Sequence, residues 1–170
     1  MKLHHLLFPL CVLADYKTVL TDIKTISKGL TTLDTSVQNM LPGIPGLPFA
    51  LKIQVDAVNL DKHLLTGVKN AQASSAFGGG GSLEVGLQLI ALKPKITSTL
   101  DQLSAKNTTF DELGIIVLAS LYALKNHTDA FGAAILPKLD SLEAGIAPGV
   151  IKSIDQAFDG AIAAYRSQRL

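Results

Sequence analysis

The stretch VLTDIKTISKGLTTLDTSVQNM, residues 19–40, decides the fold class of this chain. Its apolar residues are separated by alternating steps of four and three, the spacing that places side chains on one face of an α-helix. The stretch therefore predicts one long amphipathic helix with a single apolar face. The apolar positions are Val19, Ile23, Ile26, Leu30, Leu33, Val37 and Met40.

The same spacing returns four more times, over residues 53–71, 85–103, 113–135 and 151–165. A chain whose elements are all amphipathic helices must bury their apolar faces against one another. The sequence therefore predicts an all-α fold, a single-domain bundle of about five helices. The helix after residue 113 is apolar almost all round, which is typical of a helix in the middle of a bundle.

Four features predict where the helices begin and end. Prolines and glycines in the connector 41–48 should end the first helix, and the second should run from near Pro48 to about Ser74. The run Gly78–Gly81 is expected to form a turn. A capping box of Thr109 and Glu112 predicts the start of the fourth helix, and Pro148 should open the last one.

The composition points towards apolar partners. Hydrophobic residues make up 48% of the chain and charged residues 17%, below the roughly 25% of typical soluble domains. Either the interior is large or some apolar surface is exposed. The net charge is only +1, so the chain lacks the basic character that nucleic-acid binding requires.

Residues 1–14 are typical of a short secretory signal peptide, with a cationic tip, an apolar stretch and small residues before a cleavage site. The mature domain would then comprise residues 15–170. Cys11, the one cysteine, lies in the predicted signal, so the mature chain would have no thiol chemistry. The longest uncharged aliphatic block, residues 113–124, is too short for a transmembrane segment. We expect a secreted protein, extracellular or associated with the cell wall.

The mature sequence offers little for catalysis. Its two histidines, His63 and His127, lie in polar segments, and no hydrolase, metalloprotease or nucleotide-binding motif is present. Hydrolase activity through Ser82 or Ser120 with a distant histidine has no supporting spacing. We therefore predict that the protein is not an enzyme and needs no metal and no cofactor.

For an exported protein, two sequence patterns for N-linked glycosylation (sequons) become relevant. Asn107 begins the sequence NTT between two predicted helices, and Asn126 begins NHT on the solvent face of the fourth helix. Both are predicted glycosylation sites, and the loop position favours Asn107.

Several segments resemble the fungal hydrophobic surface binding protein A family, which includes secreted cell-wall mannoproteins. The matching segments are residues 19–34, LKPKI at 92–96, TDAFGAA at 128–134 and residues 154–165. The resemblance implies a secreted, non-enzymatic helical protein that adsorbs to hydrophobic surfaces and helps to recruit polyester- or lipid-degrading hydrolases. It also implies that a fatty acid can lie between the helices.

The leading hypothesis for function is the binding of an apolar ligand, such as a fatty acid or another lipid, or of a hydrophobic surface. The alternative is an interaction protein that adsorbs to a hydrophobic surface and recruits a secreted hydrolase. An internal ligand would lie against residues of four helices whose inward faces converge. The predicted ligand-binding residues are Ile26, Leu30, Leu64, Gly67, Val117, Leu121, Phe131 and Phe158.

Two further features leave alternatives open. Small inward residues of the second helix, Ala57, Gly67 and Ala71, either allow helices to approach closely or leave volume for a ligand. The connector residues Leu41, Ile44 and Leu47 either tuck against the end of the bundle or form a lid or surface contact.

Overall fold

The computed structural model describes residues 15–167, and the predicted signal peptide lies outside them. Long helices dominate the described part of the chain, which confirms the all-α bundle. The five long helices are α1 (Tyr16–Gln38), α2 (Leu47–Ala73), α3 (Gly78–Ala105), α5 (Gly114–Ile135) and α6 (Ser141–Arg166). The short elements are α4 (Asn107–Phe110) and the 3-10 turns η1 (Ile44–Gly46), η2 (Asp111–Leu113) and η3 (Leu136–Lys138).

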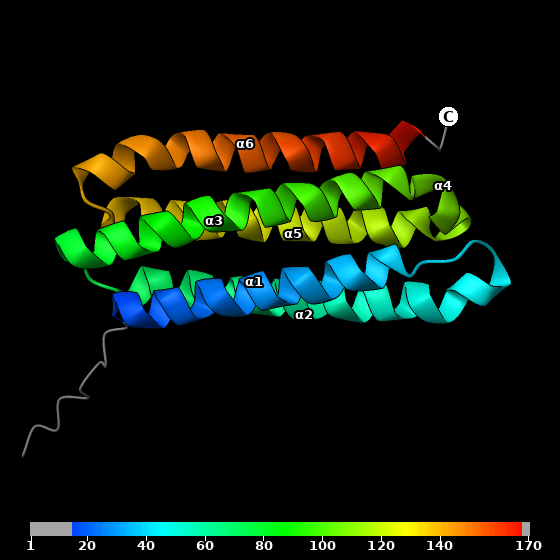
Figure 1. Ribbon diagram of the computed structural model, residues 1–170, viewed down its shortest axis with the longest axis horizontal. Helices are drawn as coiled ribbons and strands as arrows, with labels where there is room; N and C mark the ends of the chain where they lie inside the picture. Colours follow the sequence, from blue (N-terminus) through cyan, green and yellow to red (C-terminus); the bar gives the residue numbers. More distant parts are fainter. Residues whose placement is uncertain (1–14, 168–170) are drawn as a thin grey trace, which may run out of the picture.

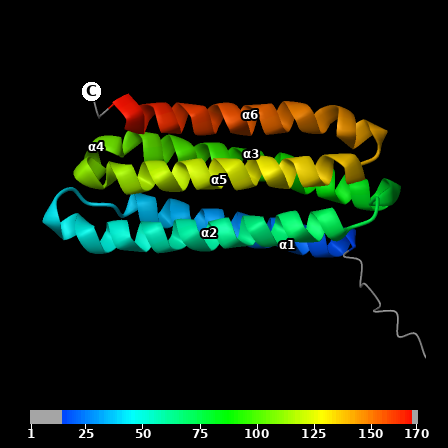
Figure 2. The ribbon, with the colours of Figure 1, turned by 180° about the vertical axis from the view of Figure 1, so that it is seen from behind.

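The five long helices form a closed ring. Around this ring the order is α1, α2, α5, α6, α3 and back to α1, and each helix packs against the two beside it. Figures 1 and 2 show the same arrangement from opposite sides, with α1 and α3 nearer in one view and α2 and α5 nearer in the other. The prediction that the fourth long helix lies in the middle of the bundle is wrong, because α5 is one member of the ring.

Chain direction alternates only in part around the ring. The pairs α1–α2 and α5–α6 are antiparallel hairpins, whereas α2–α5, α3–α6 and α1–α3 run side by side in the same direction (Figure 1). As a result, α2 and α5 begin at one end of the bundle, and α1, α3 and α6 begin at the other.

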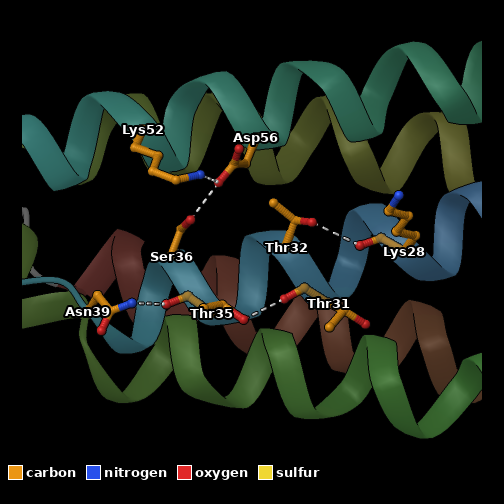
Figure 3. Close-up of polar contacts among 8 residues, drawn as sticks. All are labelled: Lys28, Thr31, Thr32, Thr35, Ser36, Asn39, Lys52 and Asp56. Atoms are coloured by element: carbon orange, nitrogen blue, oxygen red, sulfur yellow. Dashed lines mark hydrogen bonds and ion pairs between the residues drawn. The ribbon is translucent and has the colours of Figure 1, made fainter.

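Polar contacts fix the first hairpin. The side chain of Asp15 caps α1 by accepting a hydrogen bond from the backbone N–H of Thr18 over 2.9 Å. Further along, buried Asp56 accepts hydrogen bonds from Ser36 Oγ (2.5 Å) and from Lys52 Nζ (2.8 Å), as Figure 3 shows. Because a buried carboxylate without partners is costly, this contact favours a single register between α1 and α2.

The run Gly78–Gly81, expected to form a turn, is helical. Gly78 has a positive φ of 68°, but it begins α3, so the run forms the first turn of a helix and not a separate turn. A Cβ atom on Gly81 would lie 2.7 Å from Cγ of the Tyr16 ring. The missing side chain lets α3 approach α1, so packing between helices outweighs the weak helix propensity of glycine.

Two predicted helix starts are also wrong. Pro148 lies inside α6, which begins seven residues earlier at Ser141. Thr109 lies within α4, and α5 begins at Gly114 without a side-chain capping hydrogen bond. Before α5 a short helix and a 3-10 turn precede the long helix, and Thr109 lies in the first of them. Pro148 marks an internal position of α6 and not its first turn.

The glycine run yields a matched pair of substitutions. Gly80→Ala should stabilise the protein by about 0.5–1 kcal/mol, because alanine is the better helix former and a Cβ atom there meets nothing within 4 Å. Gly81→Ala should lose this gain, because the Tyr16 ring must move, and its free energy of unfolding should be at least about 1 kcal/mol below that of Gly80→Ala. Urea unfolding followed by circular dichroism measures both, and equal stability of the two variants would contradict the close contact.

Candidate functional site: two apolar cavities on the bundle axis

The ring encloses a first cavity of about 170 Å³, formed by all five long helices. It occupies the half of the bundle where α3 and α6 begin. Its lining is almost wholly aliphatic and aromatic, with Ile26 and Leu30 on α1, Leu64 on α2, and Phe131 and Phe158 on α5 and α6. Such a surface suits hydrocarbon, since it offers few hydrogen-bonding groups that would have to be desolvated.

A second cavity of about 210 Å³ lies towards the opposite end, where α2 and α5 begin. Residues of α2 and α5 supply most of its wall, and Phe110 of α4 also contributes. Val117 and Leu121 are among its buried lining residues. This cavity is also apolar, apart from Gln54 and Ser120.

Three leucines line both cavities: Leu33 of α1, Leu103 of α3 and Leu124 of α5. All three are buried. They therefore form a partition between two compartments that follow each other along the bundle axis. On α5 the lining residues extend from position 116 to position 135, a distance of about 28 Å at the rise of 1.5 Å per residue.

Each cavity reaches the surface through exposed apolar residues. The first mouth consists of five lining residues that are 45–70% exposed: Leu83, Leu87, Ile90, Leu142 and Ile146. The second mouth consists of Leu47, Leu51 and Ile116, which line the second cavity and are 45–69% exposed. An apolar ligand could therefore reach the interior from either end of the bundle.

The polar groups of the two cavities differ in charge. Thr128, Asp129 and Glu143 lie in the wall of the first cavity, so this compartment has two carboxylates. In the second cavity the hydroxyl of Ser120 donates a hydrogen bond to Gln54 Oε1 over 2.9 Å, and no charged residue contributes to the wall.

The contact between α2 and α5 has a second polar pair. Nδ1 of His127 lies 2.6 Å from Asp61 Oδ1. Asp61 is seven residues beyond Gln54, and His127 is seven residues beyond Ser120. Equal steps on both helices are what two parallel helices require if both pairs are to meet. Ser120 and His127 are thus about 10 Å apart along the helix axis, too far for a nucleophile and its base to share a hydrogen bond.

An aromatic pair lies beside the second cavity, which Phe110 lines. The rings of Phe110 and Tyr165 lie 6.1 Å apart between centroids. The buried hydroxyl of Tyr165 donates a hydrogen bond to the carbonyl of Leu103 over 2.9 Å. Burial raises the pKa of Tyr165, so the ring remains a neutral donor at physiological pH.

A third, shallow hollow on the outside of α1 and α2 is polar. Its wall contains Thr31, Thr32, Thr35 and Asn39. Most of these side chains bond to carbonyls of their own helix, as the dashed lines from Thr32, Thr35 and Asn39 in Figure 3 show. Because their hydrogen-bonding groups are already used, the hollow is a weaker candidate than the cavities.

The structure brings most of the predicted ligand-binding residues to the cavities. Gly67 differs, because it lines neither cavity and a Cβ atom there would lie 2.8 Å from the ring of Phe131. Close helix packing therefore explains this glycine. The lining residues are Ile26, Leu30, Leu64, Phe131 and Phe158 in the first cavity and Val117 and Leu121 in the second.

The predicted lid residues lie at the end of the bundle where α2 begins. Leu41, Ile44 and Leu47 are 46%, 83% and 45% exposed, and only Leu47 lines a cavity. They do not tuck against the bundle end. Among residues 15–167, no cluster of side chains could hold a metal ion.

Sequence reasoning missed the contribution of α3, which lines much of the first cavity. A signal was present. Leu83, Leu87 and Ile90 form a second apolar stripe with helical spacing, on a different face from the core stripe that begins at Val85. Gln54 and Ser120 were also missed as lining residues, because polar side chains near an apolar stripe are typical of a helix boundary with solvent.

The two sequons occupy different surroundings. Asn107 begins α4 rather than lying in a loop, and its Nδ2 donates a hydrogen bond to the carbonyl of Ala164 over 3.0 Å. Asn126 is exposed on α5. Within the described residues, no helix is both long and apolar enough to cross a membrane.

Solved structures include close matches to this fold. The crystal structure of Afmp4p in complex with palmitic acid is 30% identical, with a TM-score of 0.85, and the match covers 89% of this chain and 99% of that one. Ligand-binding domain 1 of the Penicillium marneffei MP1 protein, complexed with arachidonic acids, is 18% identical with a TM-score of 0.80 over 88% and 98% of the two chains. Domain 2 of the same protein, complexed with multiple arachidonic acids, is 18% identical with a TM-score of 0.81, and the match covers 91% of this chain and 97% of that one.

Among curated proteins, no sequence matches the chain. The sequence pattern of one protein family, however, matches residues 16–137, most of the described part. The resemblance noted from four short segments is thereby confirmed. This chain belongs to the hydrophobic surface binding protein A family.

Proposed function

We propose that the protein binds a long-chain fatty acid in the interior of its helical ring. The observation that carries this proposal is the pair of apolar cavities, which meet at Leu33, Leu103 and Leu124 and follow one axis. The palmitic acid complex of Afmp4p, which has the same fold, supports the choice of ligand.

The apolar lining favours a ligand recognised mainly through its hydrocarbon chain. Each methylene group that leaves water contributes about 0.8 kcal/mol, so a long chain can bind tightly even after the cost of ordering it. Very short acids should bind poorly, because they have few methylenes to bury.

We further propose that the protein acts without catalysis and outside the cell. Ser82 and Ser120 hydrogen-bond to Glu143 and Gln54, not to a histidine, and the family relationship supports a binding role. Export, cleavage after residue 14 and glycosylation at Asn107 or Asn126 stay predictions of the sequence. Recruitment of a secreted hydrolase also stays a prediction.

Delipidated protein should take up palmitate with a dissociation constant in the micromolar range or below, since about 8 kcal/mol of net binding free energy is within reach of a buried acyl chain. Isothermal titration calorimetry measures the affinity, and butyrate is the control that shares the carboxylate but lacks the long chain. If palmitate binds no better than butyrate, the proposed function is wrong.

The leucine partition predicts a dependence on chain length. Leu124→Phe adds bulk between the cavities and should weaken palmitate binding about tenfold or more, but octanoate, which needs less length, should lose much less. Leu118→Phe is the matched control, because Leu118 is buried on α5 and lines neither cavity. Overpacking costs about 1–3 kcal/mol of stability in either variant, so thermal unfolding is measured beside the titrations. Equal losses for both acids would contradict the partition.

A second candidate function, adsorption to a hydrophobic surface, rests on the exposed apolar residues near the start of α2. Ile44 and Leu51 are 83% and 69% exposed, and large apolar residues at a surface commonly mark a contact site. The family description also names hydrophobic surface binding.

Adsorption and ligand uptake can be separated by substitution. Ile44→Ser should reduce binding to hydrophobic beads severalfold and leave palmitate affinity unchanged, because Ile44 does not line a cavity. Leu142→Ser is the matched control at the opposite end, where Leu142 is 70% exposed and does line a cavity. A bead-binding assay measures the adsorption of the two variants, and palmitate titrations measure their ligand affinity. If Ile44→Ser lowers both activities equally, Ile44 acts in ligand entry and not in a separate surface contact.

A further inference from the structure

We infer that the fatty acid binds in one direction, with its carboxylate beside Gln54 and Ser120 in the second cavity and its tail in the first cavity. This inference rests on the proposed function and deepens it, because it assigns residues that recognise the head group. It concerns two polar side chains that a purely apolar site would not need.

The hydrogen bond between the two side chains sets the orientation of the Gln54 amide. Ser120 Oγ donates to Gln54 Oε1 over 2.9 Å. With its oxygen held in this way, the amide presents Nε2, which has no hydrogen-bond partner among residues 15–167. An amide N–H donates well to a carboxylate oxygen, and such charge-assisted hydrogen bonds are stronger than neutral ones.

Ser120 positions the glutamine and is not a second donor in this arrangement. Ser120 Oγ lies within hydrogen-bond distance of both Gln54 Oε1 and the carbonyl of Ile116. A serine hydroxyl has one hydrogen to donate, so while that hydrogen holds Gln54 Oε1, the donor offered to a bound anion is Nε2 of Gln54.

Charge separates the two compartments further. Asp129 and Glu143 line the first cavity, and a ligand carboxylate placed beside them would meet like charges in a partly desolvated site. The second cavity has no charged lining residue. An anionic head group is therefore disfavoured in the first compartment and tolerated in the second.

The second mouth also limits the cost of desolvating the head group. Leu51 and Ile116, which line this cavity beside the polar pair, are 69% and 45% exposed. A carboxylate near this opening keeps contact with water, whereas a fully buried carboxylate without a cation would be costly. The tail then extends inward past the shared leucines into the first cavity, where most of the lining side chains are apolar.

Spin-labelled fatty acids test the direction of binding in the unaltered protein. Stearate labelled at carbon 5, near the head, should broaden the NMR signals of Phe110, which lines the second cavity. Stearate labelled at carbon 16, near the tail, should broaden those of Phe131, which lines the first cavity eleven residues beyond Ser120 on α5. The reverse pattern, or equal broadening of both residues by both probes, would overturn the inference.

Substitutions test the head-group residues. Wild-type protein should bind palmitate more tightly than its methyl ester, and Gln54→Met and Ser120→Ala should each reduce this preference at least fivefold with little change in affinity for the ester. Ser153→Ala is the matched control and should keep the preference, because Ser153 lines neither cavity and its hydroxyl donates to the carbonyl of Gly149 in its own helix. Thermal unfolding confirms that each variant folds.

The outcomes separate this inference from the function on which it rests. If the wild-type protein takes up neither palmitate nor its ester, the proposed function fails and the assigned direction fails with it. If palmitate binds but the preference over the ester persists in Gln54→Met and Ser120→Ala, fatty-acid binding stands and the assignment of the head group is wrong.

Discussion

Closure of five helices into a ring is the constraint on which the interior depends. Neighbouring helix axes pack about 8–10 Å apart, so the centre of a regular five-membered ring lies roughly 7–8.5 Å from each axis. A helix with its side chains has a radius of only about 5–6 Å. The centre is therefore too narrow for a sixth helix and wider than the five helices fill. Inward leucines narrow this space into two cavities, and an extended hydrocarbon chain is the kind of ligand that fits such a channel.

Polar residues select how the ring is assembled. Apolar stripes alone would let neighbouring helices slide or exchange partners, but the pairs Gln54–Ser120 and Asp61–His127 align α2 and α5 at two levels. On the opposite side of α5, Lys125 forms an ion pair with Asp155 of α6. These contacts are partly exposed, so each adds little stability. Their main effect is to favour one register and thereby to fix which side chains face the cavities.

The helical fold and much of the cavity lining could be predicted from periodicity, because a stripe such as Ile26 and Leu30 reports which face of a helix is buried. The same stripe does not report which helix it will face, so the ring order and the place of α5 could not be predicted. The helical conformation of Gly78–Gly81 depends on contact with Tyr16, which local propensity does not contain. Gln54 and Ser120 are remote in sequence, and only the parallel packing of α2 and α5 makes them a pair.

The first half of α6 gives the ring an uneven resistance to local unfolding. Pro148 has no N–H to donate to the carbonyl of Ala144. A Cβ atom on Gly145 or Gly149 would meet nothing within 4 Å. Among positions 141–150, only Ala147 is buried. Segments with few buried contacts open at a lower free energy than the rest of a protein. Since this segment borders the first mouth, its opening would speed exchange of a bound chain through that mouth, whereas the leucine-lined interior governs how tightly that chain is held. Exchange rate and affinity are thus assigned to different residues and can change independently.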